Sequence, residues 1–111
     1  MKIDQKTPWT YDYNPYRAHD GSDIPCFEIV DSAGRRVATT DEDTTAELQQ
    51  ADACLMAAAP ELLDALEAHT EAAQAVIDAW AEGDLAGAVR WLDATLAEAR
   101  AAITKAKGGA P

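Results

Sequence analysis

The fold of this chain is decided by residues 50–67, which read QADACLMAAAPELLDALE. They join a short segment with β-strand patterning to a long half that is rich in alanine and spaced like an α-helix. Pro60 divides the stretch, because proline cannot donate a backbone hydrogen bond and clashes within a continuous helix. We therefore expect one helix to end before Pro60 and a second helix to carry Pro60 in its first turn.

The N-terminal part, residues 1–43, predicts a small antiparallel sheet of about three strands. Trp9, Tyr11 and Tyr13 alternate with polar residues, which places three rings on one side of a strand. Residues 24–30 and 35–39 suit the arms of a β-hairpin, and Asp-Ser-Ala-Gly between them suits a type I turn. The preceding residues, 19–23, have the composition of a loop. Such a small sheet needs a helix on one face to be stable.

The rest of the chain predicts three helices. Thr44 is the expected N-cap of the first (residues 44–59), because Glu47 follows at capping-box spacing. The second should cover residues 60–82 and the third residues 85–106, with Gly83 as the stop and Asp84 as the next cap. Together they predict an antiparallel helical hairpin over residues 60–107, with arms about 33 Å long. We expect a single α+β domain whose last residues, 108–111, are frayed.

Larger side chains recur at three- and four-residue spacing along each arm of this hairpin. The rows are Leu63, Leu66, Thr70, Ala73, Ile77 and Trp80, and Leu85, Val89, Leu92, Leu96, Ala99 and Ile103. We expect the two rows to pack against each other, with Trp80 in the core. Arms this rich in alanine bury little apolar area per residue, so we also expect association, preferably as a homodimer.

The net charge of the chain limits the classes of partner that it can bind. Twenty acids against nine Lys and Arg give a formal net charge of −11 in 111 residues. Such a field repels nucleic-acid backbones and anionic lipid, so we expect neither as a direct partner. The apolar runs are also too short to span a bilayer. The acidity either serves solubility alone or suits a partner with a basic surface.

Acids of the second predicted helix are the first candidate site. They lie within about 60° of one another on a helical wheel and are Asp64, Glu67, Glu71, Asp78 and Glu82. Residues 44–83 hold eight acids and no Lys or Arg. This strip could imitate phosphates and occupy a basic groove, or it could be an ordinary solvated face. Trp91, off the apolar row of the third helix, either covers the sheet or anchors the partner.

A second candidate site lies in the N-terminal part and would hold a nucleotide. Its residues are Tyr11, Tyr13, Tyr16, Arg17, Arg35 and Arg36. Aromatic rings could stack on a base while guanidinium groups grip phosphate. The simpler interpretation is that the rings form the helix-covered face of the sheet and the adjacent arginines mark a hairpin tip.

Catalytic and metal chemistry have little support. His19, His69, Cys26 and Cys54 lack the spacing of zinc ligands, and the carboxylates have no predicted cleft. Cys26 and Cys54 fall in a predicted strand and helix, with no secretory signal upstream, which is typical of buried, reduced thiols in the cytosol. We expect no enzyme activity, no cofactor and no bound metal.

The layout resembles that of small accessory proteins of tailed phages and prophages. The likeness is carried by Pro8 and Trp9, by FEIVDSAGRRVA at residues 27–38, and by AAAPELL at residues 57–63. It extends from residue 8 to about residue 68. Because most such proteins have no assigned activity, the resemblance implies no catalytic residues.

The resemblance does imply expression in the cytoplasm of a bacterial host. By analogy with small acidic phage proteins, we expect an inhibitor of host defence that binds a basic protein surface. The alternatives are a sponge that captures a nucleotide messenger of host immunity, and an accessory protein of phage morphogenesis or regulation.

Overall fold

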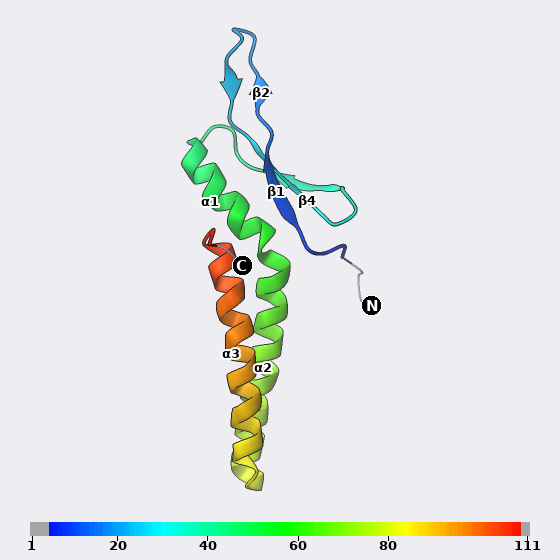
Figure 1. Cartoon of the computed structure of the whole chain (residues 1–111), viewed down its shortest axis with the longest axis vertical. Coiled ribbons are helices and arrows are strands. Elements are labelled where there is room, and N and C mark those ends of the chain that lie inside the picture. The colour runs from blue at the N-terminus through cyan, green and yellow to red at the C-terminus, as the bar shows by residue number, and fades with distance from the viewer. Residues whose placement is uncertain (1–4, 110–111) are drawn as a thin grey trace.

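The computed structural model describes residues 5–109 as an elongated α+β molecule with principal extents of 70 × 30 × 20 Å. The strands are β1 (Thr10–Tyr13), β2 (Tyr16–Arg17), β3 (Asp23–Ile24), β4 (Phe27–Val30) and β5 (Arg36–Thr39). The helices are α1 (Ala46–Ala57), α2 (Ala59–Glu82) and α3 (Leu85–Ala106). The sheet lies at one end, and α2 and α3 extend away from it as an antiparallel pair (Figure 1). The predicted fold class is confirmed.

The sheet has the order β1-β4-β5, with both pairs antiparallel. The predicted arm over residues 24–30 is wrong in one respect, because it is divided at Pro25 and Cys26. Its first residue instead belongs to β3, which pairs with β2 in a separate two-stranded ribbon. Proline has no N–H for a sheet ladder, so it favours this break. The predicted loop over residues 19–23 contributes the turn of the ribbon, where Gly21 has a φ of 86°.

The face of the sheet toward α1 carries the main core. Phe27 and Ile29 alternate inward from β4 and pack with Ala53 of α1, and the partly buried Trp9, Tyr11, Val37 and Met56 surround them. The ring centroids of Tyr11 and Tyr13 lie 6.0 and 5.2 Å from that of Phe27. The aromatic residues of β1 therefore lie on one side of their strand, as predicted.

Turn and cap chemistry fix the ends of these elements. In the turn between β4 and β5, Asp31 Oδ1 accepts hydrogen bonds from the backbone N–H of Ala33 and Arg35, at 3.0 and 2.8 Å. Thr45, rather than the predicted Thr44, caps α1 by accepting a bond from the N–H of Leu48. The Thr44 hydroxyl is engaged elsewhere, since it donates to the carbonyl of Asp41.

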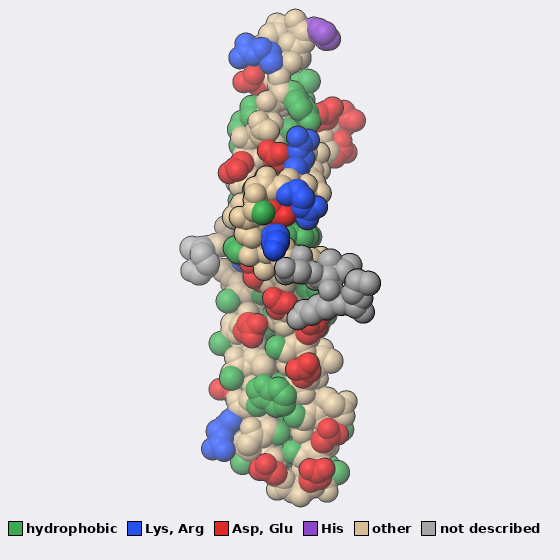
Figure 2. All heavy atoms as spheres, turned by 90° about the vertical axis from the view of Figure 1, so that its right-hand side faces the viewer, with side chains coloured by type: hydrophobic (Ala, Val, Ile, Leu, Met, Phe, Trp, Pro, Cys, Tyr) green, Lys and Arg blue, Asp and Glu red, His purple; other side chains and the backbone are tan. Residues whose placement is uncertain are grey.

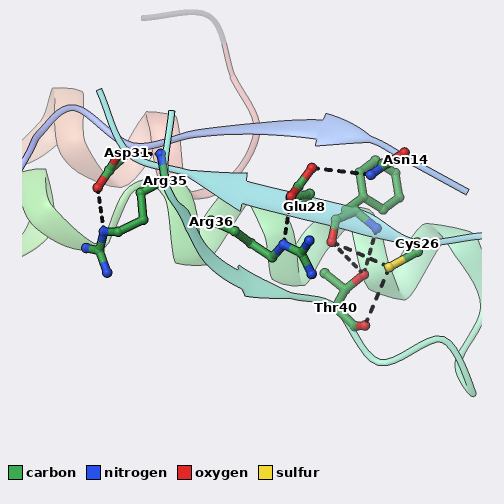
Figure 3. Close-up of polar contacts among 8 residues, drawn as sticks. Asn14, Cys26, Glu28, Asp31, Arg35, Arg36 and Thr40 are labelled. Carbon is green, nitrogen blue, oxygen red and sulfur yellow. Dashed lines mark hydrogen bonds and ion pairs between the residues drawn. The ribbon is translucent and has the colours of Figure 1, made fainter. Parts of the chain in front are cut away.

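A buried polar contact joins α1 to the sheet. Thr40 accepts a bond from the N–H of Phe27 at 3.0 Å and donates to Oε1 of the fully buried Gln49 at 2.7 Å. Gln49 in turn donates through Nε2 to the carbonyl of Thr44 at 3.1 Å. Figure 3 shows Thr40 and Cys26 together at the Phe27 end of β4.

The boundaries of the helical hairpin follow the prediction closely. Only Ala58 separates α1 from α2, and Pro60 lies in the first turn of α2. Gly83 ends α2 with a φ of 93°, in the left-handed region that glycine enters without strain. At the other end, the N–H groups of Gly108 and Gly109 donate to the last carbonyls of α3. Residues 110–111 of the predicted tail lie outside the described residues.

The interior of the hairpin differs from the prediction. Residues buried between the arms are Ala65, Ala72 and Ala79 of α2, and Thr95 and Ala102 of α3. The larger residues of the predicted rows are half-buried or exposed, and Trp80, expected in the core, is 78% exposed. Alanine at every seventh position of α2 allows the backbones to approach closely, which displaces the larger side chains from the contact.

Candidate functional site

The helical hairpin presents two chemically different sides, one on each flank of its alanine contact. On a wheel of about 100° per residue, the two sides of α2 lie in opposite directions. We call one the acidic side; it comprises Asp64, Glu71, Asp78 and Glu82 of α2 with Trp91, Glu98 and Lys105 of α3. We call the other the apolar side; it comprises Leu62, Leu66, Ala73, Ile77 and Trp80 of α2 with Leu85, Val89, Leu92, Leu96, Ala99 and Ile103 of α3.

Surface hollows confirm that side chains from both arms meet on each side. On the apolar side, Leu62, Leu66 and His69 of α2 line a hollow of about 260 Å³ with Ala99 and Ile103 of α3. On the acidic side, residues of α2 and α3 line two further hollows. The alanine row lies between the two sides.

The first hollow of the acidic side is at the α2–α3 turn. It measures about 340 Å³, and Asp78, Glu82 and Trp91 are among the residues that line it. Trp91 is 46% exposed there. The structure therefore brings three of the predicted partner-binding residues together.

Of the two alternatives for Trp91, packing on the sheet is wrong. Trp91 lies early in α3, close to the turn, and the turn is at the end of the hairpin remote from the sheet (Figure 1). Its position in the chain, a few residues after Gly83, already places it at the far end of an antiparallel hairpin.

The second hollow of the acidic side lies near the first turn of α2. It measures about 450 Å³, and Glu61, Asp64, Glu98 and Lys105 line it. Lys105 Nζ donates to Glu61 Oε1 at 2.7 Å, so one acid of this region is neutralised. This pair was not predicted from the sequence. Its signal was the antiparallel register, because Glu61 and Lys105 lie nearly equally far from the Gly83 turn.

The remaining predicted acids are also exposed. Glu71 lies between the two hollows, and Glu67 lies at the edge of the acidic side, toward the back of α2. On the face shown in Figure 2, Asp and Glu side chains follow the hairpin, whereas most of the Lys and Arg lie over the sheet end. The acids of α2 therefore line one side of the hairpin, and one of them, Glu61, is paired with Lys105.

The residues of the nucleotide-binding alternative are spread over the sheet end. Tyr16 and Arg17 lie in the ribbon that precedes β4, whereas Arg35 lies in the turn that follows it. Figure 3 shows Arg35 and Arg36 directed to different carboxylates. The ion pairs are Arg17 with Asp23 at 3.9 Å, Arg35 with Asp31 at 3.0 Å and Arg36 with Glu28 at 2.9 Å. Each of these guanidinium groups is therefore already paired with a carboxylate and would have to exchange it for a phosphate.

The tyrosines of this alternative have contacts within the sheet end. Tyr11 and Tyr13 pack against Phe27, as described above. The thiol of Cys54 donates to the hydroxyl of Tyr11 at 3.1 Å, and this bond, together with burial, raises the pKa of Tyr11. Tyr11 therefore contributes to the contact between β1 and α1.

The histidines and cysteines are in different environments. His19 is exposed near the ribbon turn, whereas His69 Nδ1 lies 3.0 Å from Thr95 Oγ1 between the arms of the hairpin. Cys26 and Cys54 are buried free thiols. Across residues 5–109, no group of three or more His, Cys, Asp or Glu side chains is placed to hold a metal ion.

Comparison with known proteins gives the family. A family model described as Salmonella phage P22 protein Y8K6 matches residues 1–110. The chain belongs to this phage protein family. The predicted relationship to small phage proteins is therefore confirmed, and the match to the P22 protein family extends past residue 68 to include the whole hairpin. No curated protein and no solved structure matched the chain.

The members of this phage family are described without an activity, so the match assigns no role to individual residues. In the part of this member that the structure describes, none of the helices is both long enough and apolar enough to cross a bilayer.

Proposed function

We propose that this phage protein is a non-enzymatic inhibitor that acts in the cytoplasm of the bacterial host. It binds a basic surface of a host defence component through the acidic side of its helical hairpin. We also propose that it acts as a homodimer.

The hollow lined by Asp78, Glu82 and Trp91 is the observation that carries this proposal. A half-exposed tryptophan beside two carboxylates provides both an apolar anchor and a charge that selects a basic partner. The six acids of α2, which holds no Lys or Arg, extend this charge along the hairpin. Such a field also accelerates encounter with a positively charged surface.

A phage plating assay tests the function. The protein is expressed in bacterial strains that carry single defence systems, and a defence-sensitive phage is plated on each. Inhibition of one system restores plating on that strain alone. The target is then purified, and its affinity for the protein is measured as the salt concentration is raised, with weaker binding expected at high salt.

Charge reversal at Asp64, Glu71 and Asp78 together should abolish the restored plating and weaken target binding by at least about tenfold, which corresponds to about 1.4 kcal/mol. The matched control reverses Asp12, Glu42 and Asp52, which are exposed acids outside the hairpin, and should leave both unchanged. Restored plating by the Asp64, Glu71 and Asp78 variant would exclude the acidic side as the binding surface.

The nucleotide-sponge alternative has less support, because Arg17, Arg35 and Arg36 already form ion pairs with Asp23, Asp31 and Glu28. Isothermal titration with cyclic nucleotides separates the two functions, since the proposed inhibitor gives no heat. A role in morphogenesis or regulation predicts a different phenotype: plating is unchanged on every defence strain, and deletion of the gene reduces phage yield in a strain without defence systems.

A further inference from the structure

We propose that the apolar side of the hairpin is the interface with a second copy of this chain, and that the two hairpins form a four-helix bundle. In this bundle α2 of each copy lies against α3 of the other, with both sheets at the same end. The inference specifies the interface of the proposed homodimer and does not depend on the identity of any host target.

Large apolar side chains on this side are exposed to solvent, where a helix surface usually carries polar residues. Leu66 and Ile77 are each 65% exposed and Trp80 is 78% exposed, while Val89 and Ile103 of α3 are about half exposed. They belong to rows with three- and four-residue spacing, as in the seams of helical bundles. Every residue of the apolar side is uncharged, although the chain carries a net charge of −11.

The contact between α2 and α3 within one hairpin leaves most of the apolar area of these rows uncovered. It is formed chiefly by alanine, which contributes little buried apolar area. Leu85, Leu92 and Leu96 are only partly buried in the single chain, and a further layer would bury more of them together with the exposed Leu66, Ile77 and Trp80. A second hairpin supplies that layer with a surface of the same length and the same spacing, as an isologous interface requires.

The apolar side is large enough for a stable dimer. Helices of about 22 residues are about 33 Å long, and two adjacent helices are about 20 Å wide, which gives a face of about 650 Å² per copy. A typical specific interface buries about 800 Å² per partner, and about 1,000 Å² in total is the lower bound for a stable one. A basic host groove would gain no ion pair on this uncharged face, so a second copy is the better-matched occupant.

Charge selects the relative orientation of the two copies. Two-fold symmetry permits α2 to face either α2 or α3 of the partner. The first arrangement brings together helices that each hold six acids and no Lys or Arg. The second places α2 beside α3, in which three bases (Arg90, Arg100 and Lys105) outnumber two acids (Asp93 and Glu98). Arg100 borders the apolar side, and it lies level with Glu67 along the hairpin, so this arrangement is favoured.

The arrangement leaves both acidic sides on the outside of the bundle, facing in opposite directions. Each dimer would therefore present two equivalent docking surfaces with parallel hairpin axes. A multivalent target would be bound more tightly than a single hairpin binds it, without any new contact.

The molar mass in solution tests the interface. Light scattering after size exclusion should give twice the chain mass of 11.8 kDa for the wild type. The double variant Leu66→Glu and Ile77→Glu should give the mass of one chain, because it buries two charges in the interface. Both positions are exposed in the isolated chain, so circular dichroism should show unchanged helix content. Ile103→Glu provides a second disruption from α3.

The matched control, Ala94→Glu with Ala101→Glu, adds the same two charges to exposed positions of α3 on the acidic side and should remain dimeric. A wild type with the mass of one chain would overturn the proposal, and so would a dimer that survives both Leu66→Glu with Ile77→Glu and Ile103→Glu. The Asp64, Glu71 and Asp78 charge reversal should lose target binding but stay dimeric. The interface and the inhibitory function can therefore fail separately.

A spin-label distance tests the orientation. The native thiols are buried, so a cysteine placed at the exposed Ala81, near the turn, can be labelled selectively. In the proposed bundle the two turns are at the same end, and the labels should be separated by much less than the hairpin length of about 33 Å. A separation equal to or greater than that length would overturn the arrangement with both turns at the same end.

Discussion

Thr40 donates a hydrogen bond of 2.7 Å to the side chain of Gln49, and both residues are buried between the sheet and α1. Gln49 is fully enclosed and also donates to the carbonyl of Thr44 at 3.1 Å. Burying a side-chain amide costs free energy unless hydrogen bonds replace those that it made to water. The buried position of Gln49 therefore depends on its two partners. The pair therefore fixes the position of α1 on the sheet.

Replacing Thr40 with valine should lower the free energy of unfolding by about 2 kcal/mol, since it leaves Oε1 of Gln49 and the N–H of Phe27 without a partner. Urea denaturation measures the change as a lower midpoint at an unchanged slope. The control Thr39→Val alters an exposed neighbour on β5 and should change the free energy by less than about 0.5 kcal/mol. Equal stability of the Thr40 and Thr39 variants would contradict the role of this contact.

Ala72 should resist enlargement. It is fully buried at the centre of the contact between α2 and α3, and leucine there would force the two backbones apart. We expect Ala72→Leu to lower the free energy of unfolding by about 2 kcal/mol. The comparison is Ala81→Leu, at an exposed position of α2, which should be nearly neutral. If Ala72→Leu is tolerated as well as Ala81→Leu, the alanine row is not the contact between the arms.

The turn at Asp31 should contribute to acid sensitivity. Burial raises the pKa of its carboxyl group, but hydrogen bonds from Arg35 and from the N–H of Ala33 outweigh burial, so the pKa is lowered from 3.8. A carboxylate whose pKa is lowered by folding stabilises the protein above its unfolded-state pKa of about 3.9. That stability is lost as the pH falls from this value through the lowered folded-state pKa.

Thermal unfolding followed from neutral to acidic pH measures this contribution. Asp31→Asn should unfold at a lower temperature than the wild type at neutral pH, and the difference should shrink as Asp31 of the wild type becomes protonated. Asp52→Asn, at an exposed position of α1, should follow the wild type throughout. A difference that persists unchanged in acid would show that the charge of Asp31 is not responsible.

The ion pair between Lys105 and Glu61 should stabilise the end of the hairpin nearest the sheet. Its Nζ and Oε1 atoms are 2.7 Å apart and both side chains are about one-third exposed, so solvent screens part of the attraction. Lys105→Met should cost up to about 1 kcal/mol, and added salt should reduce the loss. A double-mutant cycle with Glu61→Gln isolates the interaction. Zero coupling energy at low salt would show that the pair contributes nothing.

Much of the fold could be predicted from local signals. Pro60, Gly83 and the turn at residues 31–34 each impose a backbone conformation that few other residues favour, and each marks an element boundary in the structure. The ribbon formed by β2 and β3 was missed because its strands have two residues each, too few to show alternation. Pro25, within the predicted arm, was the available signal.

The packing of the hairpin could not be predicted in the same way. Spacing identifies an apolar row but does not say what covers it, so Leu66, Ile77 and Trp80 were assigned to the core of the single chain. The residues that do form the contact, such as Ala65 and Ala72, are inconspicuous in a segment where alanine is common. The acidic side could be predicted because helical spacing alone places the acids of α2 on one face. The hollow that these acids share with Trp91 could not be predicted, because it depends on how α2 and α3 align with each other.

The sheet and the hairpin have separate interiors, one around Phe27 and Ile29 and the other along the alanine row. Damage to one should therefore leave the other intact, and the energetic losses from Thr40→Val and Ala72→Leu should simply sum in a double variant. For a phage protein this division has an evolutionary meaning. Under the proposed function, the outer surface of the hairpin can accumulate substitutions that alter its docking surface without disturbing the core around Phe27 and Ile29.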